Sequence, residues 1–243
     1  MTEPRDSETG PPDRAAEPPD RAAERRDPAP APLAPTHDAA SWDAVYRSGQ
    51  APWDTGRPST ELIRVLREQH VRPGAAIELG CGSGTNAVWL AAAGFRVTGL
   101  DIAPSAVAMA RARAAEAGAS VRFVLADLLD PPAELGGPYD FVFDRGCYHA
   151  ARQFDVDRFL ATVEGLLRPG TEGLFLTGNA REPRSGPPVV SEAELRGELG
   201  RIFEIVRLRE FRMDLRPESG IGRPLGWSCF VRRSPRATPA AGG

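Results

Sequence analysis

The segment 77–84 carries the residues whose types and spacing point most directly to chemistry. It reads IELGCGSG, so Glu78 is followed by three alternating glycines, Gly80, Gly82 and Gly84. Glycine allows a tight turn and lets a ligand approach the backbone where a Cβ would collide. A carboxylate beside such a turn can hold the cationic amino group of a cofactor, or it can cap the local backbone. The segment predicts a cofactor-binding loop in which Glu78, Gly80 and Gly82 are contacts.

The spacing of this loop differs from that of a dinucleotide-binding fingerprint. The fingerprint reads Gly-x-Gly-x-x-Gly and places a helix N-terminus on a pyrophosphate, whereas Thr85 occupies the third position after Gly82. The spacing therefore disfavours an NAD-binding oxidoreductase, which stays an alternative on the same kind of sheet.

Acidic residues end the next two apolar runs. Asp101 lies where this kind of sheet places a carboxylate that accepts hydrogen bonds from two ribose hydroxyls. Asp127 suits an adenine amino group, and its apolar neighbour Leu128 can pack on the ring. Capping of a helix by Asp101 and a plain surface turn at Asp127 are the alternatives. We expect Asp101, Ile102, Asp127 and Leu128 to contact the cofactor.

Short apolar runs alternate with helical stretches around these residues, and this alternation predicts the fold. Strands are expected over residues 75–79, 95–100, 121–125, 139–143, 173–177, 203–213 and 227–232, and helices over 42–48, 59–69, 85–93, 105–117, 156–167 and 192–199. Strands that alternate with helices favour a parallel, doubly wound sheet, and the last two strands have no helix between them. We predict an α/β fold with a seven-stranded, mostly parallel sheet and an antiparallel C-terminal hairpin.

The two ends of the chain differ in composition from the remainder. Residues 1–40 are rich in Pro, Ala, Arg and acidic residues, and PPDRAAE occurs twice in succession. With almost no large apolar side chain, this tail is predicted to be disordered. We expect one domain over 41–233, which begins with a helical lid over 41–70, and a flexible C-terminus over 234–243.

Composition excludes several other chemistries. The chain has no lysine, so Schiff-base chemistry and the lysine of a P-loop are excluded. Its three cysteines lie far apart and form no zinc-ligand pair, so no metal site is expected. The net charge of -3 leaves no basic surface for nucleic acid, and no apolar run approaches the roughly 20 residues of a membrane helix. We expect a cytoplasmic monomer that binds a small-molecule substrate.

Over residues 42–232 the chain resembles the class I S-adenosylmethionine-dependent methyltransferases. More narrowly, it resembles the thiopurine S-methyltransferase superfamily, which includes halide/thiol and tellurite-resistance methyltransferases. The specific signals are Trp42 with Trp53, the run PWDTGRP at 52–58, the run FDRG at 143–146, and GPP at 186–188 leading to SEAEL at 191–195. The resemblance implies S-adenosylmethionine as the cofactor.

The resemblance also implies roles for single residues. Trp42 and the N-terminal loop would close over the cofactor, and Trp53 would border the substrate. Arg145 would lie beside both molecules, Asp101 would bind ribose, and Asp127 with Leu128 would border adenine. The chain departs from thiopurine enzymes at Asp101, where they commonly have glutamate, and in the run CYH at 147–149, so thiopurine itself is in doubt as the substrate.

A sulfonium is already an activated electrophile, so such an enzyme mainly aligns a nucleophile with the methyl group and excludes water. A soft acceptor such as a thiol, a halide or a chalcogen species needs no strong base. Arg145 or Arg57 could attract such an anion, and Trp53 could shield the site and contact the cationic sulfur. A hydrophobic staple at Trp53 and an ion pair at Arg57 are the alternatives.

His149 completes the candidate catalytic set of Arg145, Trp53 and His149. A histidine with an ordinary pKa near 6.5 can take a proton from a thiol or hydroxyl, but it can also cap a helix. The segment after the fourth strand lacks the Asn/Asp-Pro-Pro-aromatic motif of many nucleic-acid and protein amine methyltransferases, which favours a small-molecule acceptor. A silent S-adenosylmethionine-binding regulator is the remaining alternative.

Overall fold

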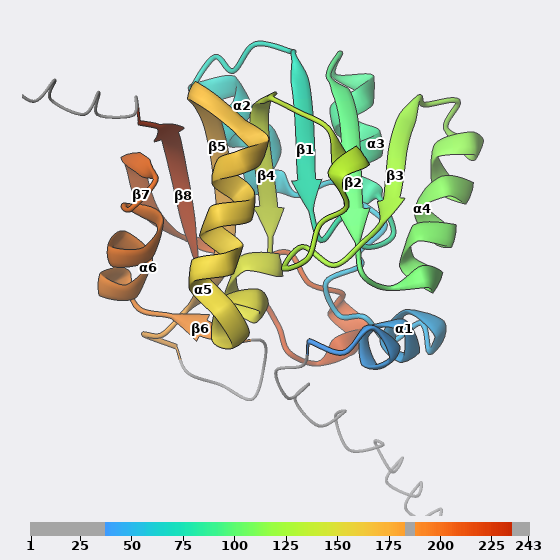
Figure 1. The fold of residues 1–243 in the computed structure, drawn as a ribbon. Helices are drawn as coiled ribbons and strands as arrows, with labels where there is room; N and C mark the ends of the chain where they lie inside the picture. The colour runs from blue at the N-terminus through green and yellow to red at the C-terminus, as the bar shows by residue number, and fades with distance from the viewer. Residues whose placement is uncertain (1–36, 183–187, 235–243) are drawn as a thin grey trace, which may run out of the picture.

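The computed structural model describes residues 37–182 and 188–234. One mixed sheet lies between two layers of helices, and α1 lies beyond the carboxyl ends of the parallel strands (Figure 1). The predicted tail over 1–40 falls almost wholly outside the described residues, as does all of the predicted C-terminal segment 234–243 except residue 234.

The described residues form α-helices, strands and two short 3-10 helices in the following order. The helices are α1 (Ala39–Arg47), α2 (Thr60–Glu68), α3 (Thr85–Ala92), α4 (Pro104–Glu116), α5 (Cys147–Leu166) and α6 (Glu192–Leu199), with η1 (Ala133–Leu135) and η2 (Pro217–Ser219). The strands are β1 (Ala75–Leu79), β2 (Arg96–Asp101), β3 (Val121–Leu125), β4 (Tyr139–Arg145), β5 (Leu167–Asn179), β6 (Val189–Val190), β7 (Phe203–Arg212) and β8 (Leu225–Arg233).

The strand order is β3-β2-β1-β4-β5-β8-β7, with the two-residue strand β6 paired beside β5. Strands β1 to β5 pair in parallel, whereas β8 is antiparallel to both β5 and β7. The chain runs outward from β1 to β3 and then returns to β4 on the other side of β1. Ligands of open α/β sheets bind at such a switch point, beyond the carboxyl ends of the strands. The predicted fold class is confirmed.

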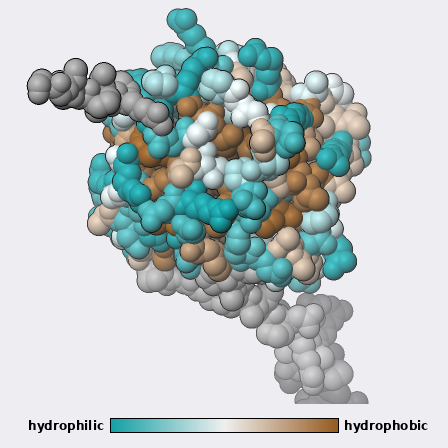
Figure 2. All heavy atoms as spheres, viewed as in Figure 1, coloured by the Kyte–Doolittle hydropathy of each residue, from teal (hydrophilic) through white to brown (hydrophobic). Residues whose placement is uncertain are grey.

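Side chains alternate between the two faces of the sheet and build a core on each. In β4, Phe141 and Phe143 pack in a cluster with residues of α2, α3 and α4, whereas Val142 packs in a cluster with residues of α5 and α6. In β5, Leu174 and Phe175 divide in the same way. Figure 2 shows the α5 side of the molecule, where polar residues cover much of the surface and apolar residues show between them.

Helix α1 begins at Ala39, three residues before the predicted start. Asp38 caps it, because its carboxylate accepts hydrogen bonds from the backbone N–H groups of Ala40 and Ser41. The composition of residues 1–40 places Asp38 in the predicted tail. A single aspartate that caps a helix cannot be distinguished by sequence from an aspartate in a loop. The boundary predicted at residue 40 thus falls inside the described fold.

Helix α5 also begins earlier than predicted, at Cys147 instead of residue 156. Four consecutive residues of its first turns are buried, so they show no amphipathic period: Tyr148, His149, Ala150 and Ala151. The Asp144 side chain accepts hydrogen bonds from the N–H groups of Gly146 and Tyr148 and so begins the helix. A break at Asp155, with φ -158° and ψ 91°, separates this start from the predicted part.

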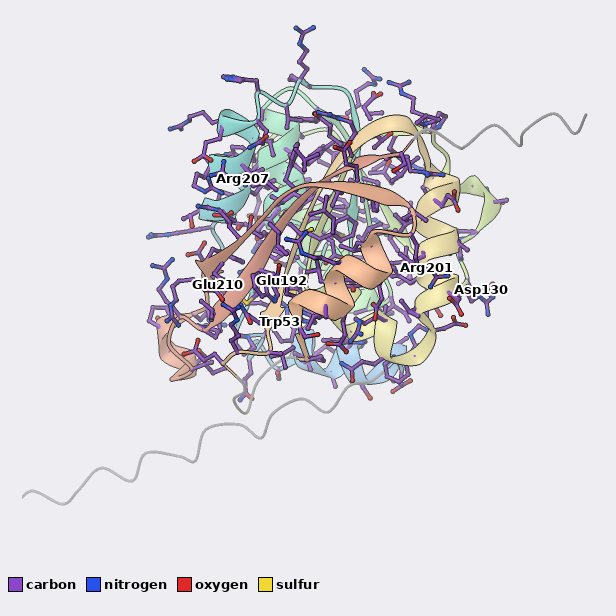
Figure 3. All side chains as sticks on the ribbon, turned by 90° about the vertical axis from the view of Figure 1, so that its left-hand side faces the viewer. Trp53, Asp130, Glu192, Arg201, Arg207 and Glu210 are labelled. Atoms are coloured by element: carbon purple, nitrogen blue, oxygen red, sulfur yellow. The ribbon has the colours of Figure 1, made fainter. Side chains whose placement is uncertain are left out.

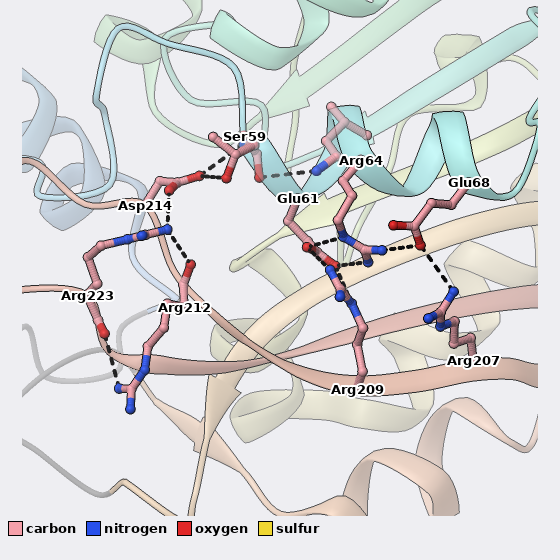
Figure 4. A network of polar contacts seen from close by, with 11 residues as sticks. Ser59, Glu61, Arg64, Glu68, Arg207, Arg209, Arg212, Asp214 and Arg223 are labelled. Carbon is pink, nitrogen blue, oxygen red and sulfur yellow. Dashed lines mark hydrogen bonds and ion pairs between the residues drawn. The ribbon is translucent and has the colours of Figure 1, made fainter.

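Ion pairs fasten α2 to the edge strand β7 (Figure 4). Glu61 is 4% exposed and accepts hydrogen bonds from Arg64, at 2.7 and 3.0 Å, and from Arg209, at 3.1 Å and through a second, shorter contact. Glu68, at the more exposed end of α2, pairs with Arg64 and Arg207. The buried acid therefore connects α2 to a strand from the C-terminal part of the chain.

We expect Glu61→Gln to lower the free energy of unfolding by about 1–3 kcal/mol, because it removes a buried charge that serves two arginines. Urea unfolding followed by circular dichroism measures the change. The control Glu68→Gln should lower the free energy of unfolding less than Glu61→Gln does, since the Glu68 carboxylate is screened by solvent. Equal effects of the two substitutions would show that burial of Glu61 does not strengthen its pairs.

Candidate active site

A cavity of about 520 Å³ lies at the carboxyl ends of the first four strands. It is covered by α1 and by two lid segments, which we define as residues 48–57 and 213–221. Trp53, in the first lid segment, lies near α1 at this end of the molecule (Figure 3). Of the predicted lid over 41–70, only α1 and the following loop line the cavity, because α2 packs on the sheet. The second lid segment carried no recognised motif.

The glycine loop after β1 has the backbone that its sequence predicts. Gly80, Gly82 and Gly84 have φ values of 60°, 53° and 77°, a left-handed conformation that favours glycine. A Cβ at Gly82 would lie 2.5 Å from the Tyr46 hydroxyl, and one at Gly80 would lie 2.8 Å from Cys147 Cβ. Only glycine therefore allows Tyr46 and Cys147 to pack this closely against the loop.

Glu78 is buried with one carboxylate oxygen left without a partner in the described structure. Its Oε1 accepts a hydrogen bond from Asn86 Nδ2 at 3.1 Å, whereas Oε2 has none. Burial raises the pKa of Glu78 to about 8, opposed by the Asn86 hydrogen bond and by the charge of Arg145. An unpaired acid at the cavity wall fits a cationic amino group, which would restore its charge.

Asp101 occupies the end of β2 and also shapes the loops beside it. Its Oδ2 accepts from the Gly82 N–H at 2.8 Å, and its Oδ1 accepts from the Ala103 N–H at 2.9 Å. Burial raises the pKa of Asp101 against these backbone hydrogen bonds. Each carboxylate oxygen has a second lone pair, so Asp101 can accept further hydrogen bonds besides these two, as the predicted ribose contact would require. Ile102 lines the same cavity.

The predicted adenine end contains a residue that the sequence analysis did not identify. Asp127 accepts from the Leu129 N–H at 2.7 Å, and its Oδ2 lies 2.8 Å from His37 Nε2. Leu128 is buried and lines the cavity. The His37 ring lies 5.5 Å from the ring of Phe154. His37 lies in the predicted tail over 1–40, and no sequence signal distinguished it from the other residues of that tail.

Three aromatic residues, two from α1 and one from the first lid segment, form one wall of the cavity. Trp53 meets Trp42 edge to face, with ring centroids 5.8 Å apart, and its Nε1 donates to the Tyr46 hydroxyl at 3.0 Å. Tyr46 was not predicted, although it lies four residues after Trp42 on the same helical face. Burial raises the pKa of Tyr46 well above its ordinary value, so the phenol is neutral.

Arg145 joins the two lid segments. Its Nη1 donates to the Trp53 carbonyl at 2.9 Å, and its Nη2 donates to the Asp214 carbonyl. The backbone N–H of Arg216 also donates to the Pro52 carbonyl at 2.7 Å. Burial lowers the pKa of Arg145, and nearby acids oppose that shift. The predicted catalytic residue therefore has a structural contact with each segment that covers the cavity.

His149 and the two cysteines at the cavity offer little basicity. His149 Nδ1 lies 3.1 Å from Thr177 Oγ1 and accepts from the Gly178 N–H at 3.2 Å, and burial lowers the pKa of His149 to about 4. Burial also raises the pKa of Cys81 and Cys147, which keeps both thiols protonated. The remaining predicted cation, Arg57, is exposed at the cavity lining.

The described residues contain neither a candidate metal-binding group nor a membrane-spanning helix. Within 37–182 and 188–234, no three His, Cys, Asp or Glu side chains come together in a group that could hold a metal ion. No helix in the same ranges is long and apolar enough to cross a membrane.

A doubly wound sheet with a glycine loop after β1, an acidic residue ending β2 and an antiparallel final pair defines the class I S-adenosylmethionine-dependent methyltransferases. Within that class, a model of the thiopurine S-methyltransferase (TPMT) family matches residues 37–223. The chain therefore belongs to the thiopurine S-methyltransferase family, which confirms the predicted resemblance and the predicted cofactor class.

Individual relatives agree with this membership. A probable thiol methyltransferase 2 of Arabidopsis thaliana is 26% identical over 80% of this chain and 87% of its own length. A ribosomal RNA small subunit methyltransferase C of Alcanivorax borkumensis is 32% identical over 60% of this chain, but the match spans only 44% of that protein. A solved structure, described by the conversion of a disulfide bond into a thioacetal group during echinomycin biosynthesis, has a TM-score of 0.70 at 25% identity and covers 81% of this chain and 93% of its own.

We expect S-adenosylmethionine binding to release close to one proton at pH 7. Glu78, with a pKa of about 8, is protonated there in the free protein, whereas the bound ammonium requires its carboxylate. Affinity should therefore rise as the pH increases from 6 to 8. Calorimetric titration in buffers of different ionisation enthalpy measures the proton.

The matched variant Glu78→Gln should release no proton and bind about 10–100-fold more weakly. Because the folded-state pKa of Glu78 exceeds the ordinary 4.5, the acid's contribution to stability is full below pH 4.5 and is lost as the pH rises through 8. The glutamine variant should therefore be at least as stable as the native protein at pH 9. Proton release that persists in this variant would assign the proton to another group.

Arg145→Lys should loosen both lid segments, because one ammonium group cannot reach two carbonyls that a planar guanidinium contacts together. Losing one charge-assisted hydrogen bond should speed amide hydrogen exchange in the two lid segments, residues 48–57 and 213–221, by about 10–100-fold. Mass-spectrometric exchange measures this, and Arg57→Lys is the control. If exchange stays at the native rate, the two contacts of Arg145 do not hold the segments.

Proposed function

We propose that this chain transfers the methyl group of S-adenosylmethionine to a soft nucleophilic atom, most simply sulfur, of a small molecule. The amino group of the cofactor would meet Glu78, its ribose would meet Asp101, and its adenine would lie by Asp127 and Leu128. The fit rests on the unpaired Glu78 oxygen and on the cavity that Gly80 and Gly82 line. The cofactor supplies an electrophilic methyl group, and the chain supplies its orientation.

The enclosure of the cavity by the two lid segments is the observation that best supports a small acceptor. The volume of about 520 Å³ lies in the range of small-molecule sites. Arg145 and His149 line this cavity. The lining also includes apolar residues of the second lid segment and the residue before β6, namely Met213, Leu215, Ile221 and Pro188. These residues would contact the apolar body of an acceptor and exclude water from the methyl group.

The residues proposed for catalysis would act by positioning and shielding the reacting molecules. Trp53 would shield the reacting atoms, because its ring lies in the wall that α1 and the first lid segment form. Arg145 would keep that wall closed through the Trp53 carbonyl and would add positive charge near an anionic acceptor. Neither role requires proton transfer.

Sulfur is the acceptor atom that the relatives favour. The thiol methyltransferase of Arabidopsis thaliana matches most of this chain, and the structure with a TM-score of 0.70 is described by sulfur chemistry. The ribosomal RNA enzyme matches over less than half of its length, so it supports the fold more than the substrate. We also propose that the protein acts as a monomer in the cytoplasm without nucleic acid.

The test is release of S-adenosylhomocysteine with a panel of thiols, iodide, thiocyanate, chalcogen oxyanions and phenols, with Glu78→Gln as the matched control. We expect turnover with at least one thiol, and loss of most turnover in the control at limiting cofactor. Tight cofactor binding without turnover on any acceptor would favour a silent regulator. Binding of NADH in place of S-adenosylmethionine would favour the oxidoreductase alternative.

A further inference from the structure

The two ring nitrogens of His149 have different surroundings. The Gly178 N–H donates to Nδ1 at 3.2 Å, and Thr177 Oγ1 lies 3.1 Å from the same nitrogen. A backbone N–H can only donate, so Nδ1 must present its lone pair. The proton of the neutral ring is therefore on Nε2.

The Nε2 edge of the ring faces Gly146 and the cavity. A Cβ added at Gly146 would lie 3.4 Å from both Nε2 and Cε1, and Gly146 and His149 both line the cavity. Nε2 has no hydrogen-bond partner in the part of the chain that the structure describes. The absence of a side chain at Gly146 thus leaves this N–H open to a bound molecule.

The charges around the ring favour its neutral form. Arg145 at the end of β4 and Arg152, one turn further along α5, both lower the pKa of His149, in addition to the larger effect of burial. Asp144 is engaged by backbone N–H groups at the start of α5, and Glu198 of α6 pairs with Arg152. The β5 residues that contact the ring carry no charge. Among the described residues, no carboxylate therefore offsets the effect of the two arginines on the ring.

We propose that His149 is a hydrogen-bond donor to the acceptor atom through Nε2–H, so that it takes no proton from the acceptor, which must already be ionised when it reacts. The inference rests on the proposed function and names the role of one residue in that site. A base at this position would need a free lone pair on Nε2, and moving the proton to Nδ1 would break the Gly178 hydrogen bond. The base considered in the sequence analysis is therefore replaced by a donor.

The methyl-transfer step balances without a proton. The electron pair of the thiolate sulfur forms the new bond to the methyl carbon, and the bond between that carbon and the sulfonium sulfur breaks. Its electron pair stays on the sulfur of S-adenosylhomocysteine, so one negative and one positive charge cancel. The His149 proton stays on Nε2 throughout.

Kinetics with two thiols of different acidity test the donor role. For 4-nitrothiophenol and 2-mercaptoethanol, kcat/KM of the native enzyme should follow the ionisation of each thiol, so the inflection of the pH profile moves with the acceptor. His149→Gln offers an amide N–H near the place of Nε2 and should keep activity within about fivefold, whereas His149→Phe should lose about 10–100-fold for both thiolates. The control His70→Asn changes an exposed histidine outside the cavity and should leave both profiles unchanged.

An inflection common to both thiols that disappears in His149→Gln would overturn the proposal, because it would report an enzyme base. Equal activity of the phenylalanine variant and the native enzyme would also overturn it, since no donor would then be needed. The comparison of glutamine with phenylalanine separates a donor from a side chain that only fills space.

Long-range ¹H–¹⁵N NMR of the native protein tests the same assignment without turnover. We expect a protonated Nε2 and an unprotonated Nδ1 for His149 at pH 7, and a shift of the Nε2 signal when thiocyanate is added to the S-adenosylhomocysteine complex. A proton on Nδ1, or no response at Nε2, would refute the donor role. If the native enzyme methylates no thiol, the proposed function fails, while this spectrum still decides the state of His149.

Discussion

The contacts of one half-buried guanidinium determine how the cavity is closed. Arg145 ends a central strand and donates to the carbonyls of Trp53 and Asp214, which belong to segments far apart in the chain. A planar guanidinium can satisfy both acceptors at fixed angles, so it sets the relative position of the two lid segments. The Asp214 carboxylate extends this connection, because it accepts hydrogen bonds from Thr60 at the start of α2 and from Arg223 (Figure 4).

Burying the charge of an acid at the carboxyl end of a strand costs free energy. Hydrogen bonds from the neighbouring loops offset this desolvation cost more fully at some acids than at others. Asp101 and Asp144 each accept two backbone hydrogen bonds, and the loops that donate them are thereby ordered. Glu78 receives a hydrogen bond from Asn86 and keeps one bare oxygen. A cationic ligand would remove the remaining desolvation cost of an ionised Glu78. Cofactor binding and protein stability are therefore coupled at this residue.

The side chains around the acceptor space share a lack of available basicity. His149 presents an N–H, Cys147 is a protonated thiol, and Tyr46 is a neutral phenol, each because burial disfavours the charged form. A sulfonium electrophile does not require such a base. It requires an aligned nucleophile and a dry site, and the aromatic wall and the lid segments are suited to provide both.

The sheet class, the glycine loop and the acids at the strand ends are predictable from the sequence, because strand periodicity, glycine spacing and strand-end carboxylates are local patterns. The family is predictable as well, through motifs such as that at 52–58. The folded structure is needed to see that Asp214 meets Arg145, that His37 reaches Asp127 and that α2 belongs to the core. It is also needed to assign the His149 proton, since the Gly178 N–H that faces the ring comes from β5 and not from α5. Such contacts join residues far apart in the chain, and burial changes their charge states, so no local pattern records them.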